Sequence, residues 1–380
     1  MCTPTGWGHQ AMETSSDDVR RPLVALKAKE GELKAISHAD DEAARRVVHM
    51  VELLDSTGRD GGRITPLLHQ AASHLASQGH PLWIDPRWLT SDSPLRRFPG
   101  GPYAYLNHIE QAVEDGLGLF VSDQPIVVPV VGEASSERDL RQVSNLREHK
   151  DRDVGLRVSR LSSSRADLEE LADRTIRFSG VAPSRIHVIV DVMYVDIPTN
   201  RLIEDAGRVA VDLAEIFRPG SITLLTGSIP EQRQGYQTLI RPRSEPELWQ
   251  SLRRSGLVGL RYGDYGVVHP TPKVSAGQAR NPHPYLNYTV PGQTITLRRP
   301  VHRTNGVMDD GALAVAFRDI ADELTDRREF AGGDFSWGDR SMIECRTGGG
   351  RKAGSVSTWI AMATSHHISH LARDVDGLAA

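Results

Sequence analysis

The sequence has little cysteine, no long apolar run and no surplus of positive charge. Its 380 residues include two cysteines, Cys2 and Cys345, which predict no disulfide framework and indicate a reducing, cytoplasmic environment. The longest apolar runs, such as residues 126–131, are far too short to cross a bilayer. Lys and Arg number 45 against 49 Asp and Glu, so no basic imbalance indicates a nucleic-acid partner. No Cys or His spacing predicts a metal site.

The remaining composition is that of a soluble globular protein. Hydrophobic residues make up 39% of the chain, and the mean hydropathy is -0.37. The length suits one large α/β barrel with additions. Residues 1–20 lack the charged and then apolar layout of a signal peptide, and we expect them to be a disordered leader.

Short β-branched runs alternate with amphipathic stretches along the first two thirds of the chain. The runs predict strands at residues 23–29, 64–69, 81–85, 126–131, 154–160, 186–192, 222–227 and 257–262. The stretches predict helices at residues 31–54, 102–117, 136–150, 164–178, 201–217 and 245–254, with a short one at 70–80. Strands separated by helices pair in parallel through crossovers. Eight such units favour a TIM-like (β/α)8 barrel over a doubly wound open sheet.

The pattern changes after the eighth predicted strand. We place the barrel at residues 21–328, with an insertion at 264–300 that contains a β-hairpin near 285–299. A helix at 309–326 is expected to serve as the eighth helix of the barrel. Residues 329–380 are expected to form a helical extension packed on the barrel, because so few apolar residues cannot build a separate core.

Alternation along the predicted strands assigns polar side chains to the barrel interior. In the first strand, Val24 and Leu26 belong under the helices, so Lys27 and Lys29 would point inward. The same alternation points further polar side chains inward, namely those of His69, Asp85, Arg157 and Arg261. Asp191 ends its strand on a face that the pattern leaves open.

Active sites of this fold lie at the C-terminal ends of the strands. The inward cations Lys27, Lys29, Arg157 and Arg261 outnumber the carboxylates, which predicts an anionic ligand bearing phosphate or carboxylate. We expect Arg261 in the barrel mouth, near one of the lysines and one of Asp85, Asp191 and Asp264. Each cation has a structural alternative as well, because a buried charge also finds a partner in an ion pair.

Four segments together resemble the beta-protein family, which is named for a phage protein and found in phages and bacteria. They are "PLVALKAKEGELKAI", "LRYGDYGVVHP", "GDFSWGDRSMIEC" and "STWIAMATSHHISH", and the resemblance covers about residues 22–370. It implies a phage-related setting, often near phage-defence genes, and no established reaction. Its motif residues are Lys27, Gly31, Glu32, Arg261, Tyr262, Gly263, Asp264, Tyr265, Asp334, Ser336, Trp337, Gly338, Asp339, Trp359, His366 and His367.

From these motifs the resemblance implies further ligand-binding candidates, namely Tyr262, Trp337, Asp339 and His366. Structural alternatives stand beside them: Trp337 is also a packing anchor, and His366 also a packing histidine or a cation near a helix C-terminus. Adjacent positions on a helix face different directions, so His366 and His367 do not readily bind one metal ion.

Three functions remain open from the sequence. The first is an enzyme acting on an anionic substrate, with Lys27, Lys29, Asp85, Asp191 and Asp264 as catalytic candidates and His69, Arg157 and Arg261 binding the ligand. The second is a non-catalytic sensor or interaction component of a phage or defence module, which binds a nucleotide or a phage-derived ligand in the same pocket and acts with a partner protein. The third is a pyridoxal-phosphate barrel, because a lysine ends the first strand. The sequence predicts no particular cofactor.

Overall fold

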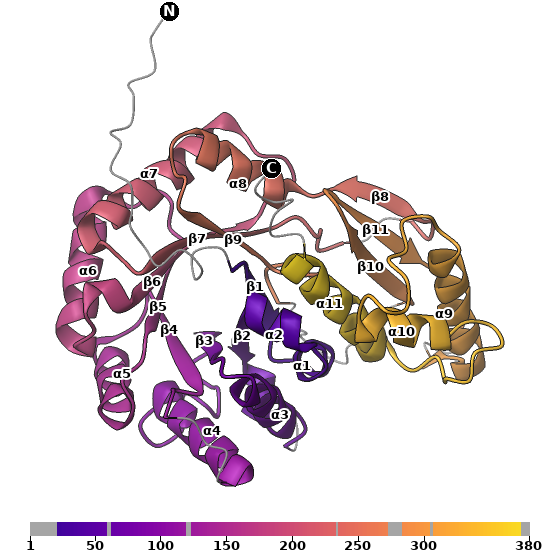
Figure 1. Ribbon diagram of the computed structural model, residues 1–380, viewed down its shortest axis with the longest axis horizontal. Helices are drawn as coiled ribbons and strands as arrows, with labels where there is room; N and C mark the ends of the chain where they lie inside the picture. The colour runs from indigo at the N-terminus through magenta and orange to yellow at the C-terminus, as the bar shows by residue number, and fades with distance from the viewer. Residues whose placement is uncertain are drawn as a thin grey trace, which may run out of the picture.

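A closed barrel of parallel strands forms the centre of the computed structural model (Figure 1). The structure describes residues 21–58, 62–118, 123–232, 235–272, 283–304 and 307–373; the leader expected at 1–20 lies outside them. In order, the barrel strands are β1 (Leu23–Lys27), β2 (Val48–Leu54), β3 (Leu82–Trp88), β4 (Val127–Gly132), β5 (Val154–Val158), β6 (Ile186–Tyr194), β7 (Ser221–Gly227) and β9 (Leu260–Asp264). The predicted (β/α)8 barrel is therefore confirmed.

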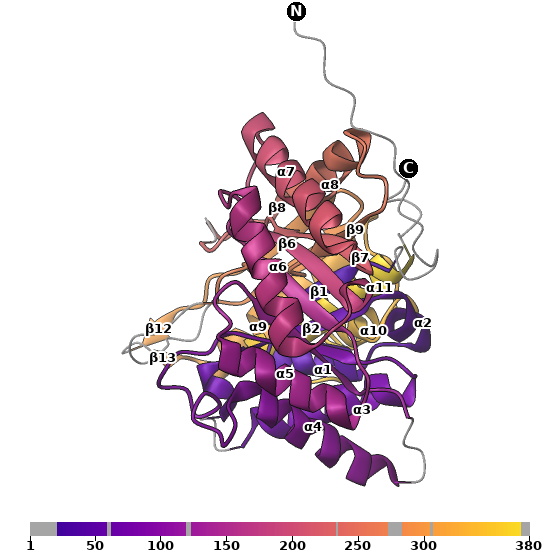
Figure 2. The same ribbon diagram turned by 90° about the vertical axis from the view of Figure 1, so that its left-hand side faces the viewer.

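Helices follow the strands and cover the outside of the barrel. They are α1 (Glu30–Ser37), α2 (Asp41–Arg46), α3 (Ile64–Ser77), α4 (Pro102–Leu117), α5 (Glu137–His149), α6 (Arg165–Ser179), α7 (Asn200–Phe217) and α8 (Ser244–Arg254). Short 3-10 turns lie at Asp55–Gly58 (η2) and Pro183–Arg185 (η4). Figure 2 shows α5, α6 and α7 side by side on the outer surface. Helices α5 and α6 each begin with a capping box, at Ser136 and Ser164, which satisfies free backbone N–H groups.

The second strand lies elsewhere than predicted. Residues 64–69 belong to α3, whereas the true second strand, β2, lies inside the segment predicted as a helix at 31–54. All seven residues of β2 are buried, so both of its faces are largely apolar and alternation does not mark it as a strand. Pro66 stands in the first turn of α3, where the missing N–H costs nothing.

The barrel interior is largely apolar in its middle part. Side chains from the inner faces of the strands pack there, among them Leu23, Ala25, Val48, Met50, Trp83, Val128, Val130, Ile189 and Leu225. A larger core lies between the strands and the surrounding helices. Polar side chains occupy the C-terminal ends of the strands, which is the end where this fold places its active sites.

A second layer packs beside the barrel. The predicted hairpin is formed by β10 (Tyr285–Val290) and β11 (Gln293–Arg298), and β8 (Leu239–Pro242) extends it to a three-stranded sheet. Strands β12 (Arg303–Thr304) and β13 (Val307–Met308) form a small separate ribbon. Helices α9 (Asp310–Thr325) and α10 (Trp337–Glu344) cover the three-stranded sheet around a core of their own, which includes Leu286, Tyr288, Phe317, Met342 and Trp359.

The last helix, α11 (Val356–Arg373), joins the two layers (Figure 1). Trp359 and Met362 enter the second core, whereas Ile368 and Leu371 pack into the core of the barrel. Helix α11 also contacts α1 and α2, so it fills the position between β9 and the start of the barrel. The prediction that the helix at 309–326 serves as the eighth barrel helix is therefore wrong: its apolar face covers the added sheet, and α11 takes that position.

Candidate functional site

Seven polar side chains meet at the C-terminal ends of the barrel strands, and we call them the mouth cluster. Six of them are no more than 3% exposed, whereas Arg87 is partly exposed. The alternation of each strand turns these side chains inward, above the apolar interior. The members of the mouth cluster are Lys27, Glu52, Asp85, Arg87, Arg157, Asp191 and Tyr265.

Arg157 lies at the centre of the mouth cluster. Its Nη1 atom donates to Glu52 Oε1 at 2.7 Å and to Asp85 Oδ2 at 2.5 Å. Its Nε and Nη2 atoms donate to Asp191 Oδ2 at 3.1 and 2.9 Å, and Nη2 also contacts the Tyr265 hydroxyl. One guanidinium thus holds carboxylates from three strands, a geometry that the fixed fork of arginine donors suits.

The other cations complete the same network. The Lys27 ammonium donates to the second carboxylate oxygen of Glu52 and lies 4.7 Å from the centre of the Tyr265 ring. Arg87 donates to Asp191 at 2.6 Å, and the Tyr265 hydroxyl donates to the other oxygen of Asp191 at 2.7 Å. Each charged group of the cluster therefore has an opposite charge in contact.

The charges of the mouth cluster balance. Three cations (Lys27, Arg87 and Arg157) face three carboxylates (Glu52, Asp85 and Asp191). Burial alone would raise the pKa of each carboxyl, but the neighbouring cations hold the pKa values of Glu52 and Asp191 below their ordinary range. For Asp85 the effect of burial is larger than the opposing effect of the Arg157 charge, so the pKa of this carboxyl is raised. The predicted excess of positive charge is therefore wrong, because Glu52 supplies a further carboxylate and two expected cations lie elsewhere.

Arg261 is one of those two cations. The prediction from strand alternation that its side chain faces the barrel interior is correct, and the residue is 1% exposed. However, its strand neighbour Gly263 pairs with Leu23, the first residue of β1. Arg261 therefore lies at the N-terminal end of the barrel, whereas Lys27 ends β1 at the mouth. The expectation that Arg261 reaches the mouth is wrong, because alternation gives the face of a strand and only register gives the height.

Two further candidates lie outside the cluster because of secondary structure. Lys29 is exposed, since β1 ends at Lys27 and Lys29 stands at the start of α1. His69 lies on α3, with its ring 6.4 Å from the ring of His108, and burial lowers its pKa. The inward positions predicted for both residues are therefore wrong.

Tyr262 and Asp264 point to the outer side of β9, toward α8 and α11. The Asp264 carboxylate accepts from Arg243 at 2.5 Å, from the Tyr262 hydroxyl at 2.9 Å and from His367 Nε2 at 2.9 Å. Burial raises the pKa of Asp264, but His367 and Arg243 more than offset this and hold it well below its ordinary value. Asp264 therefore joins α11 to the barrel. The expectation that it lies at the barrel mouth is wrong.

Three further motif residues, Trp337, Asp339 and His366, lie on α10 and α11 in the second layer. His366 Nδ1 is 2.9 Å from Asp339, its Nε2 atom is 2.7 Å from the Thr289 carbonyl oxygen, and its ring stacks on Tyr288 at 3.8 Å. Trp337 packs edge-on against His38 at 4.2 Å. These contacts connect α10, α11 and the hairpin, away from the mouth cluster.

Sequence reasoning missed Glu52, Arg87 and Arg243. Glu52 follows Val48 and Met50 at alternate positions of β2, so it would have been found had the strand been recognised. Arg87 follows Asp85 by two residues, on the same face of β3. No pattern in the sequence marks Arg243, because it lies in the loop before α8 and meets Asp264 only once the chain has folded.

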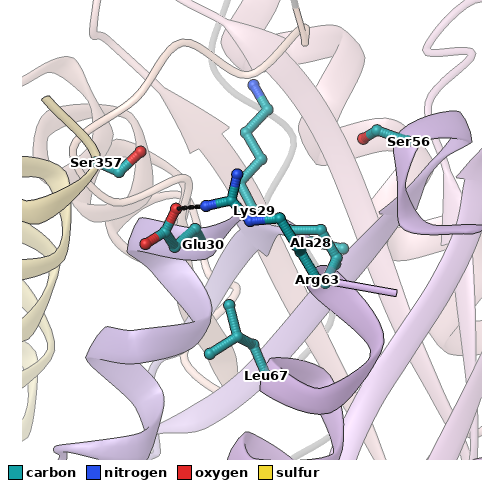
Figure 3. Close-up of a pocket in the computed structure, with 8 residues that line it drawn as sticks. Ala28, Lys29, Glu30, Ser56, Arg63, Leu67 and Ser357 are labelled. Atoms are coloured by element: carbon teal, nitrogen blue, oxygen red, sulfur yellow. Dashed lines mark hydrogen bonds and ion pairs between the residues drawn. The ribbon is translucent and has the colours of Figure 1, made fainter. Parts of the chain in front are cut away.

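A hollow of about 290 Å³ opens beside the mouth cluster, where β1 and β2 lead into their loops (Figure 3). Its lining comes from four places in the chain: the start of α1, the turn η2, the start of α3 and the start of α11. The lining residues are Ala28, Lys29, Glu30, Ser56, Arg63, Ile64, Leu67 and Ser357.

Positive charge exceeds negative charge around this hollow. Lys29 and Arg63 line it, and the single lining carboxylate is Glu30. That carboxylate already accepts from Lys34 at 2.6 Å and from Arg63 at 3.2 Å. In Figure 3, the Lys29 side chain extends past the ion pair between Arg63 and Glu30. An anion in the hollow would therefore meet more positive than negative charge along the lining.

No group of three or more His, Cys, Asp or Glu side chains in the described ranges is arranged to hold a metal ion. No helix among the described residues has the length and apolar character needed to cross a membrane.

Comparison with known proteins gives one family and several distant structures. The family model described as Beta protein matches residues 22–373. A GH10 xylanase from Thermobacillus composti is 14% identical over 65% of this chain and 84% of that chain, with a TM-score of 0.37. An endo-beta-1,4-mannanase from Thermotoga petrophila is 10% identical over 68% and 70%, with a TM-score of 0.37. A predicted mandelate racemase from Rhodobacter sphaeroides is 13% identical over 76% and 64%, with a TM-score of 0.30. No curated protein matches.

Proposed function

The chain belongs to the Beta protein family, and from that premise we propose that it is a ligand-binding protein that holds an anionic small molecule at the C-terminal face of its barrel. The ligand would occupy the hollow between β1, η2, α3 and α11. One observation carries the proposal: Lys34 and Arg63 both pair with Glu30, the single carboxylate that lines the hollow, and Lys29 adds a further cation to the same lining. Exposed ion pairs of this kind are weak, so an anion can compete for the cations.

Binding without chemistry is favoured by the state of the mouth cluster. A general acid or base must reach the reacting group of its substrate, yet the cluster is buried and its charges already contact one another. Glu30 in the hollow is bound by two cations. We therefore favour a sensor or interaction component in the phage-related or defence setting that the family resemblance implies. Ligand binding would then change its interaction with a partner protein.

Hydrolysis of the bound ligand is the second candidate, and Asp85 is the observation that favours it. Burial raises the pKa of this carboxyl, so it keeps a proton more readily than its neighbours and could act as a general acid. Turnover of phosphate esters that disappears in Asp85→Asn would support this candidate. The pyridoxal-phosphate alternative is less favoured, because a Schiff-base lysine must be accessible and Lys27 is buried against Glu52.

Titration calorimetry with inorganic phosphate and with acetate tests the binding proposal. Lys29→Ala should weaken the affinity for both anions by at least roughly tenfold, because a charge-assisted hydrogen bond contributes about 1.5–3 kcal/mol. Arg165→Ala is the control, since Arg165 lies on α6, does not line the hollow and pairs with Glu169, Asp212 and Glu215. An equal loss in the control, or no binding of either anion to the unchanged protein, would contradict the proposal.

A further inference from the structure

The hollow carries hydroxyl groups as well as cations. Ser56 comes from η2, and Ser357 comes from the first turn of α11. In Figure 3 the two serines lie on opposite sides of Lys29 and Arg63. Neither hydroxyl is engaged by a hydrogen bond to another described residue, so both can donate to a ligand.

We propose that the anion bound here is a phosphate group, held by Lys29 and Arg63 together with the hydroxyls of Ser56 and Ser357. This inference rests on the proposed function and names its ligand. A terminal phosphate offers three acceptor oxygens, whereas a carboxylate offers two. The two cations can satisfy a carboxylate by themselves, but the oxygens of a phosphate point in more directions and reach donors on both sides of the hollow.

The position of Ser357 is fixed by the packing of α11. A Cβ atom added at Gly31 would lie 2.6 Å from the Ser357 carbonyl oxygen and 3.1 Å from Ile360, so only glycine permits this approach of α1 to α11. Further along α11, His367 is bound to Asp264 at the end of β9. The hydroxyl of Ser357 therefore faces the cations from a wall that is tied to the barrel, and the last helix of the chain completes the site.

Titration calorimetry on the full chain tests the inference with three probes: inorganic phosphate, glycerol phosphate and acetate. Ser357→Ala and Ser56→Ala should each weaken phosphate binding by at least about tenfold, the usual effect of one hydrogen bond to a charged group. Acetate binding should change less than twofold. Ser355→Ala is the matched control, because Ser355 is exposed at the same end of α11 and does not line the hollow. If one serine variant does not fold, the other still tests the hydroxyl contacts.

The outcomes separate this inference from the proposed function. If both serine variants bind phosphate within twofold of the unchanged protein while Lys29→Ala weakens it, the anion site stands and the hydroxyl contacts are overturned. If acetate binds as tightly as phosphate, the phosphate assignment is overturned. If no probe binds, both the inference and the proposed function fall. Tighter binding of glycerol phosphate than of inorganic phosphate identifies a phosphorylated molecule, and the reverse identifies free phosphate.

Discussion

The mouth cluster and the hollow lie next to each other on the same face of the barrel, yet they treat charge in opposite ways. In the mouth cluster three cations contact three carboxylates, and six of its seven side chains are almost fully buried. In the hollow, two lining cations face one carboxylate that a third cation already shares, and Lys29 is exposed.

This difference separates two uses of charged residues. A buried charge without a partner costs several kcal/mol, so the cluster must balance for the barrel to fold. Exposed charges carry little such cost, and an excess of one sign can therefore be kept for a ligand. Charged residues at barrel strand ends do not by themselves indicate a binding site; the balance of charge and the space beside it do.

The largest effect is expected from removing the central cation of the cluster. Arg157→Met would leave Glu52, Asp85 and Asp191 close together without the guanidinium that binds all three. Breaking a buried ion pair in this way costs about 3–5 kcal/mol, and urea unfolding followed by circular dichroism measures it. Arg165→Met on the surface should cost less than about 1 kcal/mol. A similar small loss for both variants would remove the distinction drawn between the two regions.

A smaller effect is expected from acid. Burial raises the pKa values of Glu52 and Asp191, but the cations outweigh it and lower them. A carboxyl whose pKa is lower in the folded state than in the unfolded state stabilises the folded protein. This contribution is complete at a pH above the unfolded-state pKa of about 4, and it is lost as the pH falls through the folded-state pKa. The free energy of unfolding should therefore decrease progressively below about pH 4, as urea titrations at pH 7, 5, 4 and 3 can show.

Two variants sharpen the acid prediction. Asp191→Asn should make the dependence on acid less steep, because it removes a group with a lowered pKa. Asp85 has a raised pKa, so its ionisation opposes folding as the pH rises. Asp85→Asn should leave the loss of stability in acid at least as steep as in the unchanged protein. If the two variants behaved alike, the assignment of opposite pKa shifts would be wrong.

The smallest effect on stability is expected in the hollow. Lys29→Ala removes an exposed cation that forms no ion pair within the described part of the chain but lies near the buried Glu32 carboxyl, whose pKa is raised by burial and partly lowered by Lys29. The substitution should change the free energy of unfolding by less than about 1 kcal/mol. The same variant is expected to lose most of its anion affinity, so stability and binding should separate at this residue. A loss above about 2 kcal/mol in urea unfolding would show that Lys29 supports the fold instead of the ligand.

The sequence predicted the barrel and much of the mouth cluster because strand alternation is a local signal. Lys27, Asp85, Arg157 and Asp191, all predicted for this end of the barrel, do meet there. Glu52 was missed because β2 is buried on both faces and follows two short helices, so the whole segment resembles one long helix.

Other errors arose because contacts between distant segments are not local. Arg261 faces inward as predicted, but only the pairing of Gly263 with Leu23 reveals that it lies at the far end. The hollow needs Ser357 from the last helix beside Lys29 from the first strand's end. Nothing in the spacing of these residues predicts that they line one space.

The position of α11 has a consequence for how the protein is made on the ribosome. Residues 356–373 cover the side of the barrel where β9 meets β1, and they contact α1, which emerges more than three hundred residues earlier. Until α11 has been synthesised, the apolar surface beneath Ile368 and Leu371 has no cover. The nascent chain must therefore keep that surface away from other chains until α11 has left the ribosome, as expected for folds closed by contacts of long sequence separation.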